Sequence, residues 1–179
     1  MKLREICFAE NMEIDDEAME MMLKRKVPMV PALYFEKASI EQGPKFGMSQ
    51  RVIDGHQETL DGGMKSALRY LRAGGPVALG GDYGFAWNPH GDYAKEITFF
   101  VREVGFTPAE ALIAATRTGA EILGWQNEIG TVEPGKLADL LVVRGDVLNN
   151  VALLENRQNF EAVIQGGWLR SGRLARPDR

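Results

Sequence analysis

Apolar side chains recur at helical spacing in four segments of the chain. Two short, unbroken apolar runs follow the first and the second of these segments. The periodic segments predict helices over residues 14–26, 51–73, 92–104 and 107–123. The runs at residues 27–34 and 76–79 show no alternation, which is typical of strands covered on both faces in a parallel sheet. Pro28 and Pro31 weigh against the first of these strands.

Local signals mark the ends of these helices. Asp15 or Asp16 can cap the first helix, and Thr107-Pro108-Ala109-Glu110 combines a cap, a proline at the first helical position and a returning glutamate. The pair Gly62-Gly63 lies inside the long helix and should weaken it by about 1 kcal/mol per glycine. Residues 36–50 carry Gly43, Pro44, Gly47 and Ser49, and they read as a loop with room for one helical turn.

The pattern changes after Gly124. Three β-prone pieces, at residues 128–132, 138–144 and 160–169, are separated by Pro134-Gly135 and Gly166-Gly167. This favours a small antiparallel appendix, whereas the alternation of helices and strands before it favours parallel strands joined by crossover helices. We therefore predict an α/β fold in two parts, residues 1–124 and residues 125–179.

Composition narrows the choice of function. The 179 residues are 45% apolar with a net charge of −4, which excludes a disordered chain and makes nucleic acid an unfavourable partner. No run approaches the roughly 20 apolar residues of a membrane span, and Cys7 is the single cysteine. We expect a cytoplasmic protein with no membrane association. Its length is far below the ~250 residues of a closed eight-stranded α/β barrel.

Asp82 is the most informative polar residue. It follows Gly80-Gly81 at the carboxyl end of the second apolar run, and sites in α/β folds are built at that edge. A carboxylate there can bind a metal and accept a proton from metal-bound water, or it can simply cap a turn. His90, in the loop that follows, can bind a metal, donate a hydrogen bond to a substrate, or merely precede a helix.

The remaining candidates favour structural roles. His56 is expected to be solvated, Cys7 to fill a small apolar space, and Lys136 and Asp139 to belong to a turn between strands. The glycines near Asp82 lack the lysine and serine or threonine of a phosphate-binding loop. A small-molecule pocket is a further possibility, formed by Tyr83, Phe85, Trp87 and His90.

Taken together, four stretches resemble the metal-dependent amidohydrolase superfamily, especially its branch of imidazolonepropionase-like and prolidase-like enzymes. They are residues 78–84, 89–91, 106–116 and 129–143, the last reading Ile-Gly-Thr-Val-Glu-Pro-Gly-Lys-Leu-Ala-Asp-Leu-Leu-Val-Val. The resemblance implies the last part of a (β/α)8 TIM-type barrel, followed by the C-terminal strands of a small β-sandwich.

The same resemblance implies hydrolysis of amide-type C–N bonds with one or two divalent metals, usually zinc. Asp82 matches the aspartate at the end of the eighth strand, which binds the metal, takes a proton from the attacking water and passes it to the leaving group. His90 matches a loop histidine that contacts the substrate, a small molecule, and we expect Tyr83 to contribute to the same contact.

Other ligands of the family have no match in this sequence. The sixth-strand histidine falls on Glu10, which can bind a metal as a carboxylate, although a lost ligand is the simpler reading. Because a metal needs about three protein ligands, we expect the chain to require a partner, either an N-terminal half polypeptide or another copy of itself. The alternative is a non-catalytic remnant that acts as an oligomeric or small-molecule-binding protein.

Overall fold

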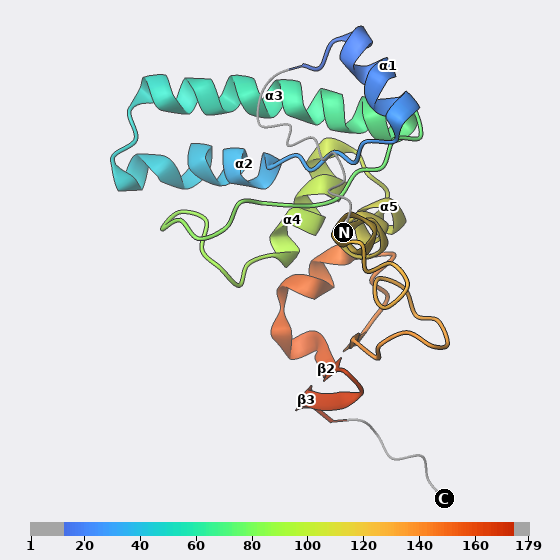
Figure 1. Cartoon of the computed structure of the whole chain (residues 1–179). Helices are drawn as coiled ribbons and strands as arrows, with labels where there is room; N and C mark the ends of the chain where they lie inside the picture. The colour runs from blue at the N-terminus through green and yellow to red at the C-terminus, as the bar shows by residue number, and fades with distance from the viewer. Residues whose placement is uncertain (1–12, 174–179) are drawn as a thin grey trace, which may run out of the picture.

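The computed structural model describes residues 13–173, and it begins with three helices (Figure 1). They are α1 (Asp16–Arg25), α2 (Leu33–Gln42) and α3 (Gln50–Arg72). The side chain of Asp15 accepts a hydrogen bond from the Ala18 N–H, so the predicted cap of the first helix is confirmed. Helices α2 and α3 lie side by side, joined by the 3-10 turn Gly43–Phe46.

Helix α2 corrects the sequence prediction, which ended a strand at residue 34 and placed a loop over residues 36–50. Leu33 and Ala38 are buried, and so are the polar residues Glu36 and Ser39. A Cβ atom on Gly63 would lie 2.5 Å from Leu33 Cδ2. Gly63 therefore lets α2 approach the long helix closely.

The two apolar runs predicted as strands lie parallel but pair only briefly. Among the described residues they form one isolated parallel bridge, between Met29 and Val77. The Met29 N–H donates to Pro76 O, and the Ala78 N–H donates to Met29 O, both at 2.9 Å. Pro28 and Pro31 have no N–H to donate, which limits the ladder to this bridge.

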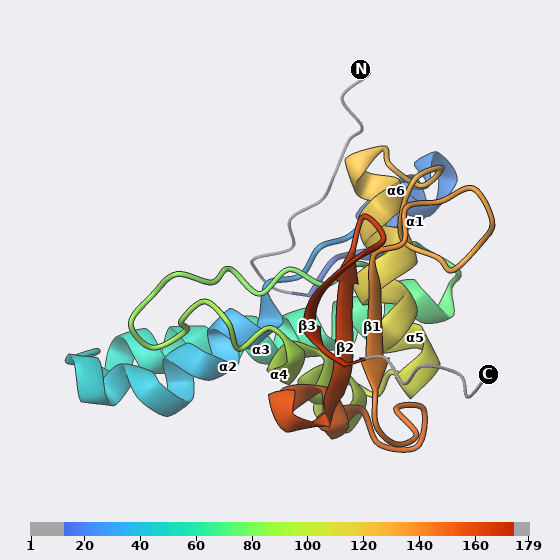
Figure 2. The same ribbon diagram turned by 90° about the horizontal axis from the view of Figure 1, so that it is seen from below.

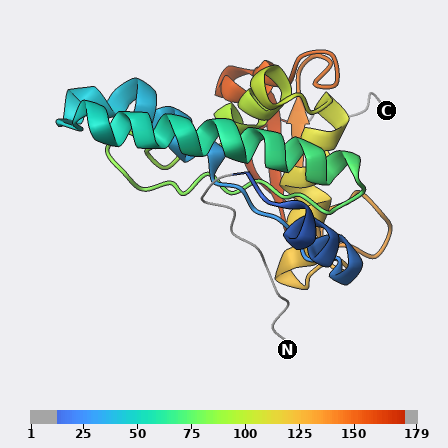
Figure 3. The same cartoon turned by 90° about the horizontal axis from the view of Figure 1, so that it is seen from above.

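The helices predicted after residue 92 are confirmed, with local variations in winding. They are α4 (Ala94–Phe99), continued as a π-helix over Phe100–Val104, and α5 (Pro108–Ile113), continued through a π-helix (Ala114–Thr118) into α6 (Gly119–Leu123). The predicted capping box at Thr107 and Glu110 forms in both directions. Figure 3 shows α3 lying across these shorter helices. The core between them includes Met29, Leu33, Ala67, Tyr70, Phe100 and Ala111.

The C-terminal part is a three-stranded antiparallel sheet in the order β1-β2-β3 (Figure 2), which confirms the small antiparallel appendix that was predicted. The strands are β1 (Leu140–Val143), β2 (Phe160–Gln165) and β3 (Trp168–Gly172). Two short 3-10 helices, Val151–Glu155 and Arg157–Asn159, lie between β1 and β2. Gly166 and Gly167 have φ values of 56° and 82°, the left-handed backbone of a tight hairpin turn.

Residues 128–132 form turns and bends, so the strand predicted there is wrong. Gly130 has a φ of 93°, and its backbone packs against α6. Across residues 13–173, no helix combines the length and apolar character needed to cross a membrane.

Candidate functional site

Asp82 stands in an unusual backbone conformation just beyond the parallel bridge. Its φ of 44° is in the left-handed region, which residues other than glycine seldom adopt. The Asn88 side chain holds the turn in place: Nδ2 donates to the carbonyl oxygens of Gly81 at 2.6 Å and of Asp82 at 3.1 Å. Asn88 is almost completely buried, so these bonds are shielded from water. The turn thereby presents an exposed Asp82 side chain at the strand end.

A second buried polar residue supports the same turn from α4. Glu96 Oε1 accepts a hydrogen bond from the Gly80 N–H at 3.1 Å, and the Glu96 residue is 4% exposed. Burial raises the pKa of its carboxyl group to about 7, although the bond from Gly80 acts in the opposite direction. Residues 80–82 are thus fixed by two buried side chains, Glu96 at the Gly80 N–H and Asn88 at the Gly81 and Asp82 carbonyls.

Asp82 lies at the edge of an open cleft of about 360 Å³. The other lining residues come from the start of α2 and from the N-terminal half of α3: Ala32, Phe35, Glu36, Val52, Gly55, His56 and Thr59. Within the cleft, His56 Nδ1 and Glu36 Oε2 lie 2.5 Å apart. The structure therefore brings Asp82 together with an acid and a histidine from two separate helices.

His56 was expected to be solvated, and this expectation is wrong. Its side chain is 19% exposed and packs edge-on against Phe35, with ring centroids 5.8 Å apart. Sequence reasoning missed it because its partner, Glu36, is 20 positions away in a segment predicted as a loop. The pair could have been predicted only if residues 33–42 had been assigned to a helix, because Glu36 then faces the helix that carries His56.

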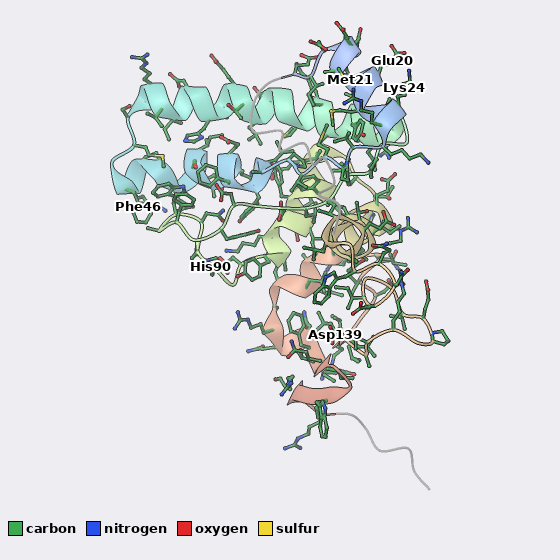
Figure 4. The ribbon with its side chains drawn as sticks, in the orientation of Figure 1. Glu20, Met21, Lys24, Phe46, His90 and Asp139 are labelled. Carbon is green, nitrogen blue, oxygen red and sulfur yellow. The ribbon has the colours of Figure 1, made fainter. Side chains whose placement is uncertain are left out.

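Tyr83 and His90, the predicted substrate contacts, lie outside the lining of this cleft. Tyr83 stacks on Tyr34 at 6.2 Å and meets the ring of Tyr93 edge-on at 4.7 Å. Burial, followed by the negative charge of Glu96, raises the Tyr83 pKa; the hydroxyl lies near Glu96 without a hydrogen bond of good geometry. His90 is exposed, and its Nδ1 lies 3.1 Å from Tyr93 Oη (Figure 4). Their roles in substrate contact stay predictions.

The aromatic residues of the same loop attach it to α2. Phe85 and Trp87 stack on each other at 5.1 Å, and both rings contact Phe35. The Trp87 Nε1–H also donates to Ser39 Oγ at 3.0 Å. Neither Phe85 nor Trp87 lines the cleft beside Asp82. Their contacts instead fix the loop against the helix that carries Glu36.

Lys136 and Asp139 make structural contacts, as predicted, but they precede β1 and do not join two strands, because residues 128–132 form no strand. Asp139 (labelled in Figure 4) accepts a hydrogen bond at Oδ1 from the Gly166 N–H at 2.6 Å. This bond connects the hairpin between β2 and β3 to the start of β1. Lys136 contacts the Thr131 hydroxyl and the Glu133 carboxylate. Glu10 and Cys7 lie outside the described residues, so the ligand role predicted for Glu10 remains a prediction.

The described residues do not complete a metal site. Within residues 13–173, no group of three or more histidine, cysteine, aspartate or glutamate side chains is placed to hold a metal ion. Asp82 can offer one oxygen ligand, whereas a catalytic zinc usually takes three protein ligands and keeps one position open. The described residues therefore supply one possible metal-binding side chain, that of Asp82, which a fixed turn holds at the edge of a cleft.

Comparison with known proteins places these features in a family. The amidohydrolase family profile matches residues 3–169. An imidazolonepropionase from Geobacillus kaustophilus is 34% identical over 101 residues, which are 56% of this chain and 24% of that protein. A putative prolidase from Bifidobacterium longum superposes with a TM-score of 0.80 and 28% identity, over 93% of this chain and 42% of the other.

A Xaa-Pro dipeptidase solved with methionine bound in its active site superposes with a TM-score of 0.74 and 27% identity, over 89% of this chain and 38% of that protein. The chain thus spans less than half the length of each of these proteins. The family profile matches most of the sequence, and the α/β fold with its small antiparallel sheet resembles solved amidohydrolase-type structures. The chain belongs to the amidohydrolase family.

Proposed function

We propose that this chain forms the C-terminal part of a metal-dependent amidohydrolase that hydrolyses amide-type C–N bonds. In this proposal, the Met29–Val77 pair corresponds to the last strands of a (β/α)8 barrel, and β1 to β3 belong to a small β-sandwich. The observation that carries the proposal is the Asp82 turn, in which two buried polar side chains hold a strained backbone so that its carboxylate borders a cleft. Such strain is typical of functional positions.

Asp82 is the catalytic residue of this proposal and one of its metal ligands. A divalent metal, usually zinc in this family, would supply an activated water when the site is complete. Asp82 acts as the proton carrier: its carboxylate accepts a proton from the attacking water and later donates it to the leaving nitrogen. Asn88 and Glu96 keep the carboxylate at the cleft edge through their bonds to the backbone.

The remaining ligands must come from outside residues 13–173. We infer that they are provided by a second polypeptide, equivalent to the N-terminal half of a full-length family member, or by another copy of this chain. Large apolar side chains exposed in the C-terminal part support such a partner, since Val132 is 83% exposed and Trp168 is 73% exposed. Glu10 is a further candidate ligand within this chain.

Complementation tests this proposal directly. The chain is mixed with the part of the Bifidobacterium longum protein that it does not match, and metal content and hydrolysis of Xaa-Pro dipeptides, N-acyl amino acids and lactams are measured. We expect a complex that binds zinc and hydrolyses at least one of these classes. The substitution Asp82→Asn should lower kcat by about 10²–10⁴-fold, the range typical of a lost acid–base group.

Asp92→Asn is the matched control, because Asp92 lies in the same loop and pairs with Lys95 at the surface. It should leave hydrolysis unchanged. A zinc-loaded complex that hydrolyses its substrate equally well with Asp82→Asn would contradict the proposal. A stable, metal-free oligomer of this chain, unaffected by Asp82→Ala in sedimentation, would instead support the non-catalytic alternative.

A further inference from the structure

The pairing of Glu36 with His56 fixes one side of the cleft. Glu36 is 7% exposed, and its carboxylate lies 2.5 Å from Nδ1 of the histidine. A carboxylate accepts hydrogen bonds, so Nδ1 acts as the donor in this contact and the imidazole ring is held in one orientation. Nε2 is then the ring nitrogen available to a ligand in the cleft. The polar end of the cleft is therefore preorganised before any ligand arrives.

Apolar residues lie beside this polar pair and leave room for a ligand. Phe35 packs edge-on against His56, and the Val52 residue is 46% exposed. Gly55 adds no side chain, and a Cβ built on it would meet no atom within 4 Å. A cleft of about 360 Å³ that combines apolar side chains with a few fixed polar groups suits a small molecule or a substrate side group.

The polar side chains that line the cleft select the kind of ligand. The two carboxylates belong to Glu36 and Asp82, the imidazole to His56, and no lysine or arginine is among the lining residues. A ligand carboxylate would face two carboxylates of the protein, which is unfavourable, whereas a cation or an N–H donor would be attracted.

From this geometry we propose that the cleft is a substrate-specificity site, and that it binds a group with a cationic or N–H donor head on an apolar stem. Glu36 and His56 contact the head, and Phe35 and Val52 contact the stem. This assignment rests on the proposed function only in taking Asp82, at the edge of the cleft, as the hydrolytic carboxylate. It predicts that the family's reaction in this protein favours substrates with a basic or amide-bearing group beside the scissile bond.

The chain offers a direct readout, because His56 and His90 are its only histidines. In a sample labelled with 15N-histidine, the imidazole nitrogens are followed by NMR during titrations, and the variant His90→Gln assigns the signals. Three probes share one aromatic body: benzamidine is cationic, benzyl alcohol is neutral and benzoate is anionic. We expect benzamidine to move the Nε2 signal of His56 saturably, and benzoate to bind at least tenfold more weakly.

Two isosteric variants on α2 separate the local effect from net charge. Glu36→Gln should abolish most of the preference for benzamidine over benzoate. Glu41→Gln removes the same charge from an exposed position paired with Lys37, and it should preserve the preference. Circular dichroism of each variant confirms that α2 and α3 remain folded.

Three results would overturn the assignment: no shift of the His56 signals with benzamidine, equal or tighter binding of benzoate, or an unchanged preference in Glu36→Gln. The titration needs neither metal nor a complementing polypeptide. A failure here therefore leaves the complementation result standing, and a failure of complementation leaves the binding preference standing.

Discussion

The helical part and the C-terminal sheet of this chain are built in opposite ways. The largest fully buried side chains, including Tyr70, Phe100 and Met29, all lie before residue 101. In the sheet, every residue of β3 is exposed, and few of the described residues after 124 are buried, Val151 and Ala162 among them. The helical part therefore makes its own core, whereas the sheet has one strand with no covering layer.

This difference explains where the candidate site lies. A turn with a left-handed aspartate stores strain of about 1–3 kcal/mol, and only a well-packed surrounding structure can maintain it. The Asp82 turn meets this requirement because Asn88 and Glu96 beneath it are buried. The exposed sheet provides apolar surface instead, as expected of a region that another layer of protein covers.

The largest expected effect contrasts the core of the helical part with the exposed strand β3. Phe100→Ala should lower the free energy of unfolding by about 3–5 kcal/mol, because Phe100 is fully buried and contacts Phe99 and Phe106 edge-on. Trp168→Ala removes a larger side chain from β3 but should change this free energy by less than about 0.5 kcal/mol. Urea unfolding of both variants measures the contrast. Equal losses would mean that the sheet is as well packed as the helices.

Next in size is the pH dependence that Glu96 imparts. Its folded-state pKa of about 7 exceeds the ordinary 4.5, so the folded chain holds this proton more tightly than the unfolded chain does. The benefit is fully present below pH 4.5 and is lost as the pH rises through 7, which amounts to about 3 kcal/mol. Glu96→Gln removes this loss, so its stability relative to wild type should rise between pH 4.5 and 7.

Urea unfolding at pH 5, 6, 7 and 8 tests this prediction. The control in the sheet is Glu161→Gln, which removes an exposed ion pair with Arg144 that is worth less than about 1 kcal/mol. A constant difference between Glu96→Gln and wild type across this range would contradict the assignment of the raised pKa to Glu96.

A smaller effect is expected from the buried asparagine under the Asp82 turn. Asn88→Ala should cost about 1–2 kcal/mol, because the Gly81 carbonyl loses its partner in a buried position. The exposed Asn149, which bonds only the Asp146 side chain through its amide, should cost less than about 0.5 kcal/mol when replaced by alanine. Amide hydrogen exchange at residues 80–84 should speed up in Asn88→Ala alone. Unchanged exchange there would show that the turn does not depend on Asn88.

The smallest expected contrast concerns helix caps. Thr107→Ala should cost about 1 kcal/mol, since it removes one half of the capping box that begins α5. Asn150→Ala, at the start of the 3-10 helix Val151–Glu155, should cost a few tenths of a kcal/mol, because a single short turn depends on that cap. Thermal unfolding resolves the difference. A reversed order would mean that the region before β2 is more cooperative than its exposure indicates.

Sequence reasoning succeeded where a signal is local. The caps at Asp15 and Thr107, the long helix and the Gly166-Gly167 hairpin follow from neighbouring residues, and all are present. It failed at α2, whose inward face carries Glu36 and Ser39 among the apolar residues. Those polar side chains are buried because His56 and Trp87, from distant segments, satisfy them. No periodicity of apolar residues could have revealed that helix.

The sequence by itself determined the family and the place of Asp82 after an apolar run and two glycines. Those properties depend on residue types and on spacing over a few positions. Only the tertiary structure decided that Glu36 and His56 share a cleft with Asp82, and that Asn88 and Glu96 hold its turn. The physical reason is that a buried polar group needs a partner, and here each partner is brought in by folding.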